Sequence, residues 1–455
     1  MHTHGTDARA EHRELALFTD LYELTMLRAY YEEGMTGTAV FSLFVRRLPE
    51  QRNFLLACGL DSVLDYLENL RFSEADLEYL ATLDRFPADF LERLRALRFT
   101  GNVYAVPEGT PLFADEPILE LEAPLPEAQL AETFIMNQIT VQTVLASKAA
   151  RMVAAAGGRP VVDFGARRMH GLDAALKAAR AFHIAGIAST SNVLAGRRYG
   201  VPLSGTMAHS YVQAHDDESA AFRNFARLYP GTVVLVDTYD TLAGVRRVID
   251  LIKAGPDIDI SAVRLDSGDL ASLARESRRL LDTAGLSHIR ILASGGLDEQ
   301  RIAALVAEDV PIDGFGVGTS MGVSADAPDL DIAYKLCEYA GSGRLKLSAG
   351  KPILPGRKQV YRFGGDSGDE RDLITLADEQ APGRPLLQPV MRNGTRLPAG
   401  ETDINEARDY AAGQIARLPP RLLDLAAADP PYPVAISDAL GAYQEQVREA
   451  VHERR

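Results

Sequence analysis

The sequence predicts an α/β protein with an irregular, seven-stranded β/α barrel and a second α/β domain formed by both the N- and C-terminal segments. Three observations support this fold class. Seven short apolar runs in the middle of the chain each end in a polar or glycine-rich tail, and helix-like stretches separate most of them. Short runs punctuated by turn residues occur both before and after this region. Successive strand–helix units favour a parallel sheet. A doubly wound open sheet is the alternative to the barrel.

Composition excludes several classes of protein. The chain has 455 residues, too many for one ordinary core, so we expect two or three structural units. Its net charge of -15 argues against a nucleic-acid partner. We expect no membrane span, because no apolar run reaches roughly 18 residues. Cys58 and Cys337 form no CxxC motif, and the polar start of the chain lacks the apolar core of a secretory signal. These features favour a cytoplasmic, reduced protein.

The first part of the chain mixes helices and strands. Residues 20–33 are typical of a helix, with Asp20 as its N-cap and Glu23 completing a capping box. The segment TAVFSLFV (38–45) is rich in β-branched and aromatic residues, which predicts a strand. Residues 127–156 predict one long helix that ends at a pair of glycines.

A change of pattern then defines the domains. We expect an N-terminal α/β domain over 1–150, the barrel over 151–335, and a C-terminal segment over 336–455 that packs back on the N-terminal domain. The last assignment follows because this segment has the same alternating, turn-rich pattern as residues 101–126. The barrel strands are predicted from PVVDFGARR (160–168), IASTSN (187–192), VPLSGTMAHS (201–210), TVVLVDTYD (232–240), SAVRLDSGD (261–269), RILASGG (290–296) and IDGFGVGTS (312–320).

Polar side chains gather at the tails of these predicted strands. In parallel β/α folds, ligand-binding groups project from the carboxyl ends of the strands. Asp237 and Asp266 provide carboxylates that suit ribose hydroxyls or a Mg²⁺ ion bridging phosphates. Arg167 and Arg264 offer planar guanidinium groups for a carboxylate or a phosphate. His209 has small and hydroxyl-bearing neighbours in GTMAHS, which favours a functional histidine over one that only packs.

The last two tails are rich in glycine. Glycine lets backbone N–H groups approach an anion closely, and the loops after the final barrel strands commonly hold a phosphate. The residues expected to bind phosphate are Ser294, Gly295, Gly296, Gly316, Gly318 and Thr319. The patterns therefore predict an enzyme that binds a phosphorylated sugar, without naming its reaction. A sugar-phosphate lyase or isomerase is a more remote alternative, because no strand tail carries a lysine for a Schiff base.

Several motifs together carry a family resemblance. In chain order they are FTDLYELTM (18–26), VPEGTPLFADEPILELEAPLPEAQLAET (106–133), VDFGARR (162–168), GTMAHS (205–210), VDTYDT (236–241), VRLDSGDL (263–270), GVGTSM (316–321) and KLSAGKPILPGRKQVYRF (346–363). They resemble the motifs of the nicotinate phosphoribosyltransferase family, in the same order. The resemblance extends from about Leu17 to Phe363.

The resemblance implies a reaction. Nicotinate and 5-phosphoribosyl-1-pyrophosphate would give nicotinate mononucleotide and pyrophosphate, in NAD biosynthesis, with Mg²⁺ present. ATP would be a co-substrate, hydrolysed through a phosphohistidine that His209 matches. Together with His209, we expect Asp237 and Asp266 to be catalytic. The ligands of the Mg²⁺ ion and the ATP-binding residues are not indicated, because no P-loop motif occurs.

The resemblance also implies partners and further site residues. The family is typically dimeric, with sites completed across the interface, and its fold is an irregular β/α barrel beside an α/β domain built from both chain ends. Tyr22 matches a tyrosine of the partner subunit that stacks on the pyridine ring. Thr206 and Arg264 match nicotinate-site residues, where we also place Arg167, and Thr319 matches a contact to the phosphoribosyl pyrophosphate.

A nicotinamide phosphoribosyltransferase is the nearest alternative. That family is similar around the second strand tail but carries an aspartate where STSNVLAG has Ser191. An aspartate accepts from a carboxamide and repels a carboxylate, whereas a serine can donate to a carboxylate. Ser191 therefore favours the acid as substrate.

Overall fold

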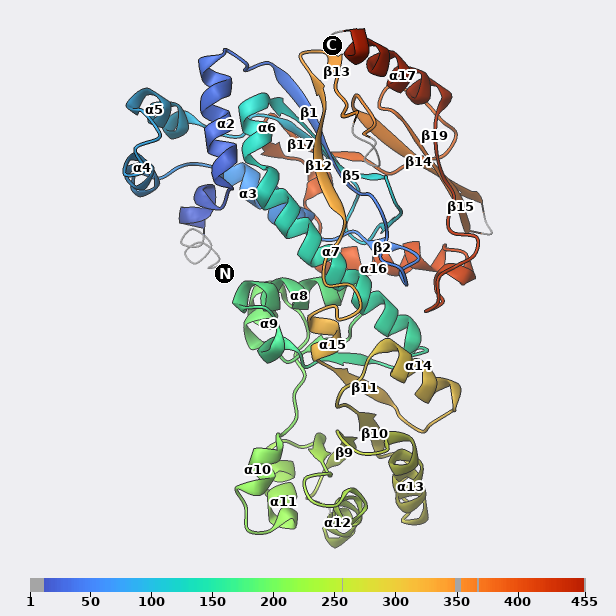
Figure 1. The fold of residues 1–455 in the computed structure, drawn as a ribbon. Coiled ribbons are helices and arrows are strands. Elements are labelled where there is room, and N and C mark those ends of the chain that lie inside the picture. The colour runs from blue at the N-terminus through green and yellow to red at the C-terminus, as the bar shows by residue number, and fades with distance from the viewer. Residues whose placement is uncertain (1–11, 256, 348–352, 366–367, 454–455) are drawn as a thin grey trace. The chain divides into compact units, whose positions relative to one another are not determined.

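The computed structural model describes residues 12–453, apart from 256, 348–352 and 366–367. Its contacts divide the chain into two compact units. The terminal unit comprises Met1–Val144 and Asp329–Arg455, and the central unit comprises Leu145–Pro328. Figure 1 labels the elements of both, and each unit is described by itself.

Both ends of the chain contribute to the main sheet of the terminal unit. This sheet has seven strands in the order β13-β12-β1-β5-β3-β17-β18, and all of its pairings are antiparallel. The predicted strand TAVFSLFV is confirmed as β1, which lies between β5 and β12. The strands are β1 (Thr38–Val45), β3 (Asn102–Ala105), β5 (Pro117–Pro124), β12 (Ile332–Tyr339), β13 (Ser342–Gly343), β17 (Gln388–Arg392) and β18 (Thr395–Arg396).

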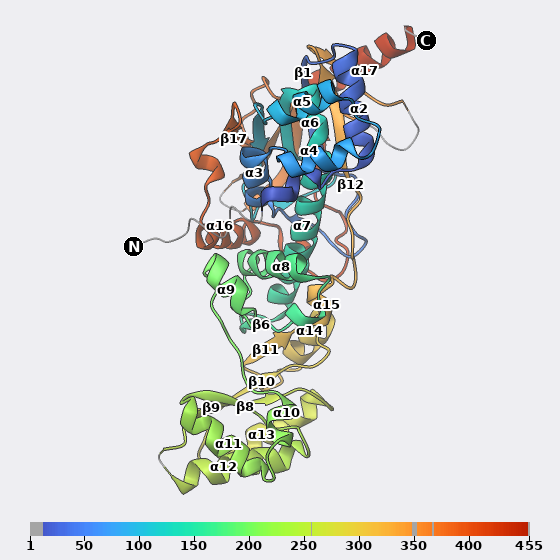
Figure 2. The same ribbon diagram turned by 90° about the vertical axis from the view of Figure 1, so that its left-hand side faces the viewer.

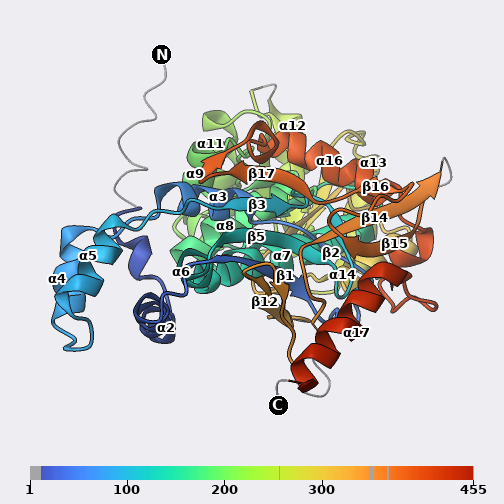
Figure 3. The same cartoon turned by 90° about the horizontal axis from the view of Figure 1, so that it is seen from above.

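A second sheet of the terminal unit is built entirely from the C-terminal part of the chain. Its order is β16-β14-β15-β19, and a separate pair joins β2 to β4. Helix α17 (Asp438–Glu453) lies along β15 (Figure 3). Phe113 and Tyr432 stack in the apolar cluster beneath this sheet, with ring centroids 3.8 Å apart. The strands are β2 (Leu55–Leu56), β4 (Pro111–Leu112), β14 (Lys358–Gly365), β15 (Gly368–Leu376), β16 (Arg384–Pro385) and β19 (Val434–Ile436).

The first long helix begins as predicted, but its capping box does not form. Helix α2 follows Asp20, whose carboxylate makes no cap hydrogen bond and instead accepts from Thr133 Oγ1 at 2.8 Å. Glu23 is buried and accepts from Thr19 and from Thr133. The capping box was wrong because tertiary partners on another helix take both carboxylates.

The other helices of the terminal unit surround the two sheets. The long helix expected over 127–156 is interrupted at Ala131, giving α6 and α7. The helices are η1 (His12–Leu17), α2 (Leu21–Glu32), α3 (Leu60–Asn69), α4 (Glu74–Ala81), α5 (Ala88–Ala96), α6 (Leu125–Leu130), α7 (Glu132–Ala155), η3 (Pro398–Gly400), α16 (Ile404–Ala416) and η4 (Pro420–Leu422). Helix α7 continues into the central unit.

The central unit contains an open parallel sheet. Its order is β7-β6-β11-β10-β9-β8, so the first strand of the unit pairs with both the second and the last, as it would in a barrel. The two edge strands, β7 and β8, do not pair with each other. The strands are β6 (Val161–Asp163), β7 (Ser189–Thr190), β8 (Thr232–Leu235), β9 (Ile260–Leu265), β10 (Arg290–Ala293) and β11 (Gly314–Val317).

The irregular, seven-stranded barrel is therefore not confirmed. The run over 201–210 makes one isolated parallel bridge, between Leu203 and Thr190, within the described residues. Pro202 has no N–H to extend a ladder. The chain leaves the sheet after Ser204, whose N–H donates to the Thr190 carbonyl at 3.0 Å. The central sheet is thus an open half-barrel of six strands.

Helices connect the parallel strands, and acidic caps begin several of them. Helices α11, α12 and α13 lie together beside β8 and β9 (Figure 2). Asp217, Asp240, Asp269 and Asp298 each cap a helix with their carboxylates. The helices are η2 (Ala166–Arg168), α8 (Leu172–Ile184), α9 (Val193–Tyr199), α10 (His209–Gln213), α11 (Glu218–Leu228), α12 (Thr241–Ala254), α13 (Leu270–Thr283), α14 (Glu299–Ala307) and α15 (Thr319–Gly322).

A membrane-spanning helix is absent from the described ranges of the chain, because none of their helices is both long and apolar enough.

Candidate active site

The carboxyl ends of the parallel strands meet at one edge of the central sheet, and hydrogen bonds join their side chains. Asp237 follows β8, Asp266 follows β9 and Ser294 follows β10. Asp237 Oδ2 accepts from the Asp266 N–H at 2.9 Å and from Ser267 Oγ at 2.6 Å. Asp266 Oδ1 accepts from Ser294 Oγ. Three of the predicted site residues therefore form one connected group, and we call this group, together with Arg264 and His209 beside it, the strand-end site.

Two polar atoms of this group have no partner. Asp237 Oδ1 and Arg264 Nε are buried, and neither makes a hydrogen bond in the described part of the chain. A buried polar atom without a partner costs about 1–3 kcal/mol. Such atoms are best explained by a ligand or an ion that supplies the missing interaction.

Arg264 is the cation of the site. Its guanidinium donates to Thr206 Oγ1 and to the Met207 carbonyl, the latter at 3.2 Å, and it lies 5.8 Å from the ring centroid of Phe164. Burial lowers the pKa of this guanidinium, and the carboxylates of Asp266 and Asp237 oppose that change. The arginine is held in place through Nη1 and Nη2.

His209 begins helix α10 at the same edge. Its Nδ1 lies 3.2 Å from Thr238 Oγ1, and its Nε2 lies 3.9 Å from Asp266 Oδ2. The side chain is 41% exposed, so a ligand can reach the ring. If Nδ1 carries the proton and donates it to Thr238, the Nε2 lone pair is free for a reaction. Thr238 was not among the predicted site residues, although its place in VDTYDT, next to Asp237, is the signal that could have found it.

The glycines of the predicted phosphate cradle have different roles. Gly295 has a φ of +87°, and a Cβ atom there would lie 1.7 Å from the Asp266 carbonyl oxygen. Gly316 is buried in β11, where a Cβ atom would lie 2.6 Å from the Phe164 ring. Gly295 therefore permits the close approach of two strand ends, and Gly316 makes room for the aromatic ring below Arg264.

The remaining cradle residues lie at two strand ends. Gly296 adjoins Gly295, and its carbonyl accepts from Arg301 at 2.9 Å. Gly318 precedes helix α15, and the exposed Thr319 begins it. The structure thus places all six predicted phosphate-binding residues on or after β10 and β11.

Arg167 and Ser191 lie at the ends of β6 and β7. Arg167 is in η2, and its charge is one of the influences on the pKa of Arg264. The Ser191 N–H donates to the Asp163 carbonyl at 2.9 Å. The buried Asp163 carboxylate accepts from Thr190 Oγ1 at 2.7 Å and from the Gly165 N–H at 2.8 Å, which ties the β6 and β7 ends together.

Tyr22 belongs to the terminal unit, whereas the strand-end site belongs to the central unit. Tyr22 lies on α2 and is 46% exposed. Partial burial and the neighbouring carboxylate of Glu132 raise its pKa.

The carboxylates of the strand-end site suit a metal ion that takes most of its ligands from a substrate. Groups of three or more His, Cys, Asp or Glu side chains that could hold an ion are absent from the described residues. Mg²⁺ commonly takes one or two carboxylates and completes its octahedron with waters and substrate phosphates. Asp237 Oδ1, which has no partner, and the half-exposed Asp266 carboxylate suit this role.

Fold and site together define the class of protein: an α/β enzyme with acidic, basic and imidazole groups at the carboxyl ends of a parallel half-barrel. Comparisons with known proteins identify the family within this class. Residues 17–140 match the nicotinate phosphoribosyltransferase N-terminal domain, and residues 160–360 match the nicotinate phosphoribosyltransferase family. The chain belongs to the nicotinate phosphoribosyltransferase family.

Individual relatives support this assignment over most of the chain. Nicotinate phosphoribosyltransferase pncB2 of Mycobacterium tuberculosis is 56% identical over 442 residues, covering 96% of this chain and 94% of that protein. The nicotinate phosphoribosyltransferase of Bacillus subtilis is 44% identical over 377 residues, covering 80% and 77%. The crystal structure of human nicotinic acid phosphoribosyltransferase has a TM-score of 0.83 at 29% identity, covering 94% of this chain and 99% of that one. The predicted family is confirmed.

Proposed function

We propose that this protein joins nicotinate to 5-phosphoribosyl-1-pyrophosphate, giving nicotinate mononucleotide and pyrophosphate for NAD biosynthesis. The observation that carries the proposal is Arg264, a half-buried cation whose buried Nε has no partner in the described residues, among the carboxylates and hydroxyls of the strand-end site. A guanidinium in this state can hold the carboxylate of nicotinate. The names of the relatives, which cover nearly the whole chain, support the same reaction.

The other predicted residues fit the two substrates. Thr206, Arg167 and Ser191 would bind nicotinate with Arg264. The ring nitrogen of nicotinate attacks the anomeric carbon, the C–N bond forms, and pyrophosphate leaves with the electrons of the broken C–O bond. Asp237 and Asp266 would stabilise the positive charge that develops on the sugar.

Phosphate groups of the sugar substrate would lie on the loops after β10 and β11. Ser294, Gly295 and Gly296, with Gly316, Gly318 and Thr319, would form this cradle. Asp237 and Asp266 would hold Mg²⁺, whose positive charge would stabilise the pyrophosphate leaving group.

We place ATP coupling at His209. The neutral Nε2 attacks the γ-phosphorus of ATP, the N–P bond forms and ADP leaves; water later breaks the N–P bond and releases phosphate. Thr238 supports this role, because its hydroxyl lies against Nδ1 and leaves Nε2 for the reaction. A phosphorylated ring would place negative charge beside Asp266, and hydrolysis would relieve this repulsion and drive the cycle forward.

We also propose a homodimer in which Tyr22 completes a site of the partner subunit. The exposed ring of Tyr22, on a helix with the exposed Phe18 and Leu21 nearby, supports this role. Mixing inactive Tyr22→Ala and inactive Asp266→Ala chains should restore part of the activity, since one site of a mixed dimer is intact. No recovery after confirmed subunit exchange would contradict shared sites.

Substrate preference tests the reaction directly. Initial rates with labelled nicotinate and nicotinamide should give a kcat/KM at least about 100-fold higher for nicotinate, because the amide has no charge to pair with Arg264. Arg264→Gln should raise the KM for nicotinate. Arg290→Gln, an exposed arginine at the amino end of β10, is the control and should leave it unchanged. Comparable kcat/KM values for the two substrates would contradict the proposal and favour a nicotinamide enzyme.

The variant His209→Ala tests the role of His209, because transfer and its stimulation by ATP should respond differently to this change. In His209→Ala, we expect slow residual transfer, no stimulation by ATP and no label on histidine from γ-labelled ATP. The wild-type label should be acid-labile and alkali-stable, as expected of a phosphoramidate. Full ATP-stimulated synthesis in His209→Ala would show that the coupling does not use this histidine.

A further inference from the structure

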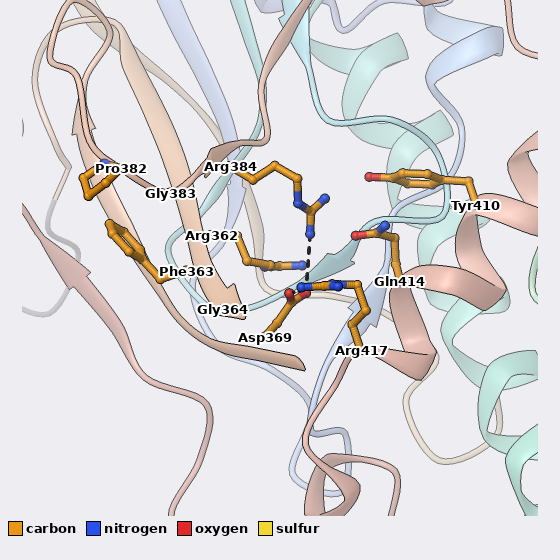
Figure 4. A pocket seen from close by; sticks show the side chains of 10 residues that line it. All are labelled: Arg362, Phe363, Gly364, Asp369, Pro382, Gly383, Arg384, Tyr410, Gln414 and Arg417. Atoms are coloured by element: carbon orange, nitrogen blue, oxygen red, sulfur yellow. Dashed lines mark hydrogen bonds and ion pairs between the residues drawn. The ribbon is translucent and has the colours of Figure 1, made fainter. Parts of the chain in front are cut away.

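A cavity in the terminal unit is lined by none of the residues assigned to the reaction. Its volume is about 510 Å³, and strands β14, β15 and β16 and helix α16 enclose it (Figure 4). This volume lies within the range of about 300–1,000 Å³ that is usual for small-molecule sites. The cavity is therefore large enough for an organic molecule and larger than a bare inorganic ion requires.

Two arginines share one carboxylate on the wall of this cavity. Arg417 Nε lies 2.9 Å from Asp369 Oδ1, and Arg384 Nη2 lies 3.4 Å from Asp369 Oδ2. Asp369 is only 2% exposed, whereas the side chains of Arg384 and Arg417 are 39% and 41% exposed. One carboxylate balances one of the two cations, so this wall carries an excess positive charge that is open to a ligand.

The third arginine of the cavity lining is already paired and does not add to this excess charge. Arg362 pairs with the buried Asp372, through Nε at 3.0 Å and Nη2 at 2.6 Å. Its Nη1 is buried and has no hydrogen-bond partner in the described part of the chain. The pair is fully buried, so the position of the guanidinium is fixed before any ligand arrives.

The opposite wall provides groups that suit a polar organic molecule. The buried Gln414 Oε1 has no hydrogen-bond partner among the described residues, and the hydroxyl of Tyr410, on the same helix, lies 3.3 Å from Thr110 Oγ1. In Figure 4 the side chains of Tyr410 and Gln414 extend from α16 toward the arginines. A tyrosine hydroxyl opposite two partly exposed guanidinium groups suits a ligand with both hydroxyl groups and anionic oxygens.

A main-chain hydrogen bond also joins Asp369 to Arg417. The Asp369 N–H donates to the Arg417 carbonyl at 2.8 Å. Gly368 has a φ of +121°, and a Cβ atom there would lie 2.5 Å from the same carbonyl oxygen. The carboxylate and one of its arginines are thus joined through the main chain as well as through their side chains, which preorganises the wall.

We propose that this cavity is a second ligand site, which binds a phosphate monoester with a sugar-bearing organic part. Arg384 and Arg417 bind the phosphate, as planar guanidinium groups do in many phosphate sites. The Tyr410 hydroxyl, which Figure 4 shows opposite these arginines, hydrogen-bonds to a sugar hydroxyl.

Binding to the full-length chain tests the site. The probe is ribose 5-phosphate, measured by equilibrium dialysis, with inorganic phosphate and AMP as comparisons. Because the strand-end site also binds phosphate esters in our proposal, the readout is the number of sites per chain. Arg384→Gln should lose one site, or weaken it at least tenfold, while Asp369 keeps its closer partner Arg417. Arg448→Gln, an exposed arginine on α17, makes the same change of charge outside the cavity and should keep the wild-type number.

A chemical footprint localises the ligand independently. Ribose 5-phosphate should protect Arg384 and Arg417, but not Arg448, from an arginine-specific glyoxal reagent, as read by peptide mass spectrometry. Equal site numbers in wild type and Arg384→Gln, or no protection of Arg384, would overturn the proposal. If inorganic phosphate bound this site as tightly as ribose 5-phosphate, the proposal that the site recognises a sugar-bearing organic group would be overturned. Tighter binding of AMP would support the proposal with a nucleoside as the organic part.

Discussion

The core of the terminal unit and the strand-end site of the central unit use charged side chains in opposite ways. In the terminal unit, Glu120 and Lys358 are both buried, with Nζ and Oε1 3.2 Å apart, and Ser42 Oγ donates to the same carboxylate oxygen at 2.6 Å. At the strand ends of the central unit, Asp237 and Arg264 each keep a buried polar atom without a partner. His209 and Asp266 are both more than one third exposed.

This difference in pairing depends on whether a charge lies in a core or at the strand ends, and not on which unit contains it. The central unit also contains a closed, buried network, in which Lys148 lies 2.6 Å from Glu299, with Arg151 at 3.0 Å from the same carboxylate. Charges within a core must be paired, because an unpaired buried charge is very costly. Charges at the carboxyl ends of parallel strands can keep free atoms for a ligand. At the strand-end site, incomplete pairing goes together with the exposure of His209 and Asp266, whereas the two core ion pairs above are buried.

Removal of a core charge should have the largest effect on stability. Lys358→Met leaves the Glu120 carboxylate buried without its cation, and we expect a loss of about 3–5 kcal/mol in the free energy of unfolding. Denaturant unfolding followed by circular dichroism measures it. The double variant Lys358→Met/Glu120→Gln should recover part of the loss, because it removes the uncompensated charge. A loss of less than about 1 kcal/mol in Lys358→Met would show that this pair is not the closed core interaction described above.

Removal of a strand-end charge should affect activity instead. Asp266→Asn keeps the shape of the side chain, so the unfolding midpoint should change little. We expect kcat to fall about 100-fold to 1,000-fold, as when a group that stabilises transition-state charge is lost. Asp269→Asn on the same loop is the matched control, since Asp269 is a helix cap bonded to Ser272. If Asp269→Asn lost as much activity as Asp266→Asn, the division between cap and site would fail.

The hydroxyl of Thr238 should have a smaller effect, specific to the histidine. Thr238→Val removes the partner of His209 Nδ1 while keeping the volume. One lost hydrogen bond is worth about 1 kcal/mol, so we expect phosphorylation of His209 to slow by about fivefold to tenfold. The measurement is the rate of label transfer from γ-labelled ATP. Thr238→Ser retains the hydroxyl and should be close to wild type, and an equal loss in both variants would point to packing instead.

Substitution of a buried carboxyl group in the terminal unit should have the smallest effect. We expect it to appear only as a change in how the unfolding free energy depends on pH. Burial raises the pKa of Glu23 to about 7, above its ordinary value, although Thr19 and Thr133 oppose the shift. The folded chain then keeps a proton that the unfolded chain releases, so stability from this group is present below the ordinary pKa and is lost as the pH rises through about 7. The difference in unfolding free energy between wild type and Glu23→Gln should decrease over this window. A difference that stays constant from pH 5 to 8 would contradict the raised pKa.

Local sequence patterns predicted helices and strands correctly where no tertiary contact overrode them. The apolar, β-branched segment over 38–45 forms β1, and six of the seven apolar runs in the middle of the chain become parallel strands. The run over 201–210 failed because hydrophobicity cannot show that Pro202 and the chain path toward His209 end its pairing. The capping box at Asp20 failed because Thr133, far away in sequence, takes both carboxylates.

The sequence by itself determined the family, the order of strands and helices, and the residue types available at the strand ends, because motifs and periodicity are local properties of the chain. The tertiary structure decided which of those residues meet. Asp237 and Asp266 are joined through a backbone N–H, whereas the neighbouring Asp269 is used as a helix cap. Thr238 and His209 are far apart in sequence, and so are Arg384 and Arg417, until the fold brings each pair together. Hydrogen bonds and burial depend on distance in space, and for residues from different strands that distance is set only when the sheet has formed.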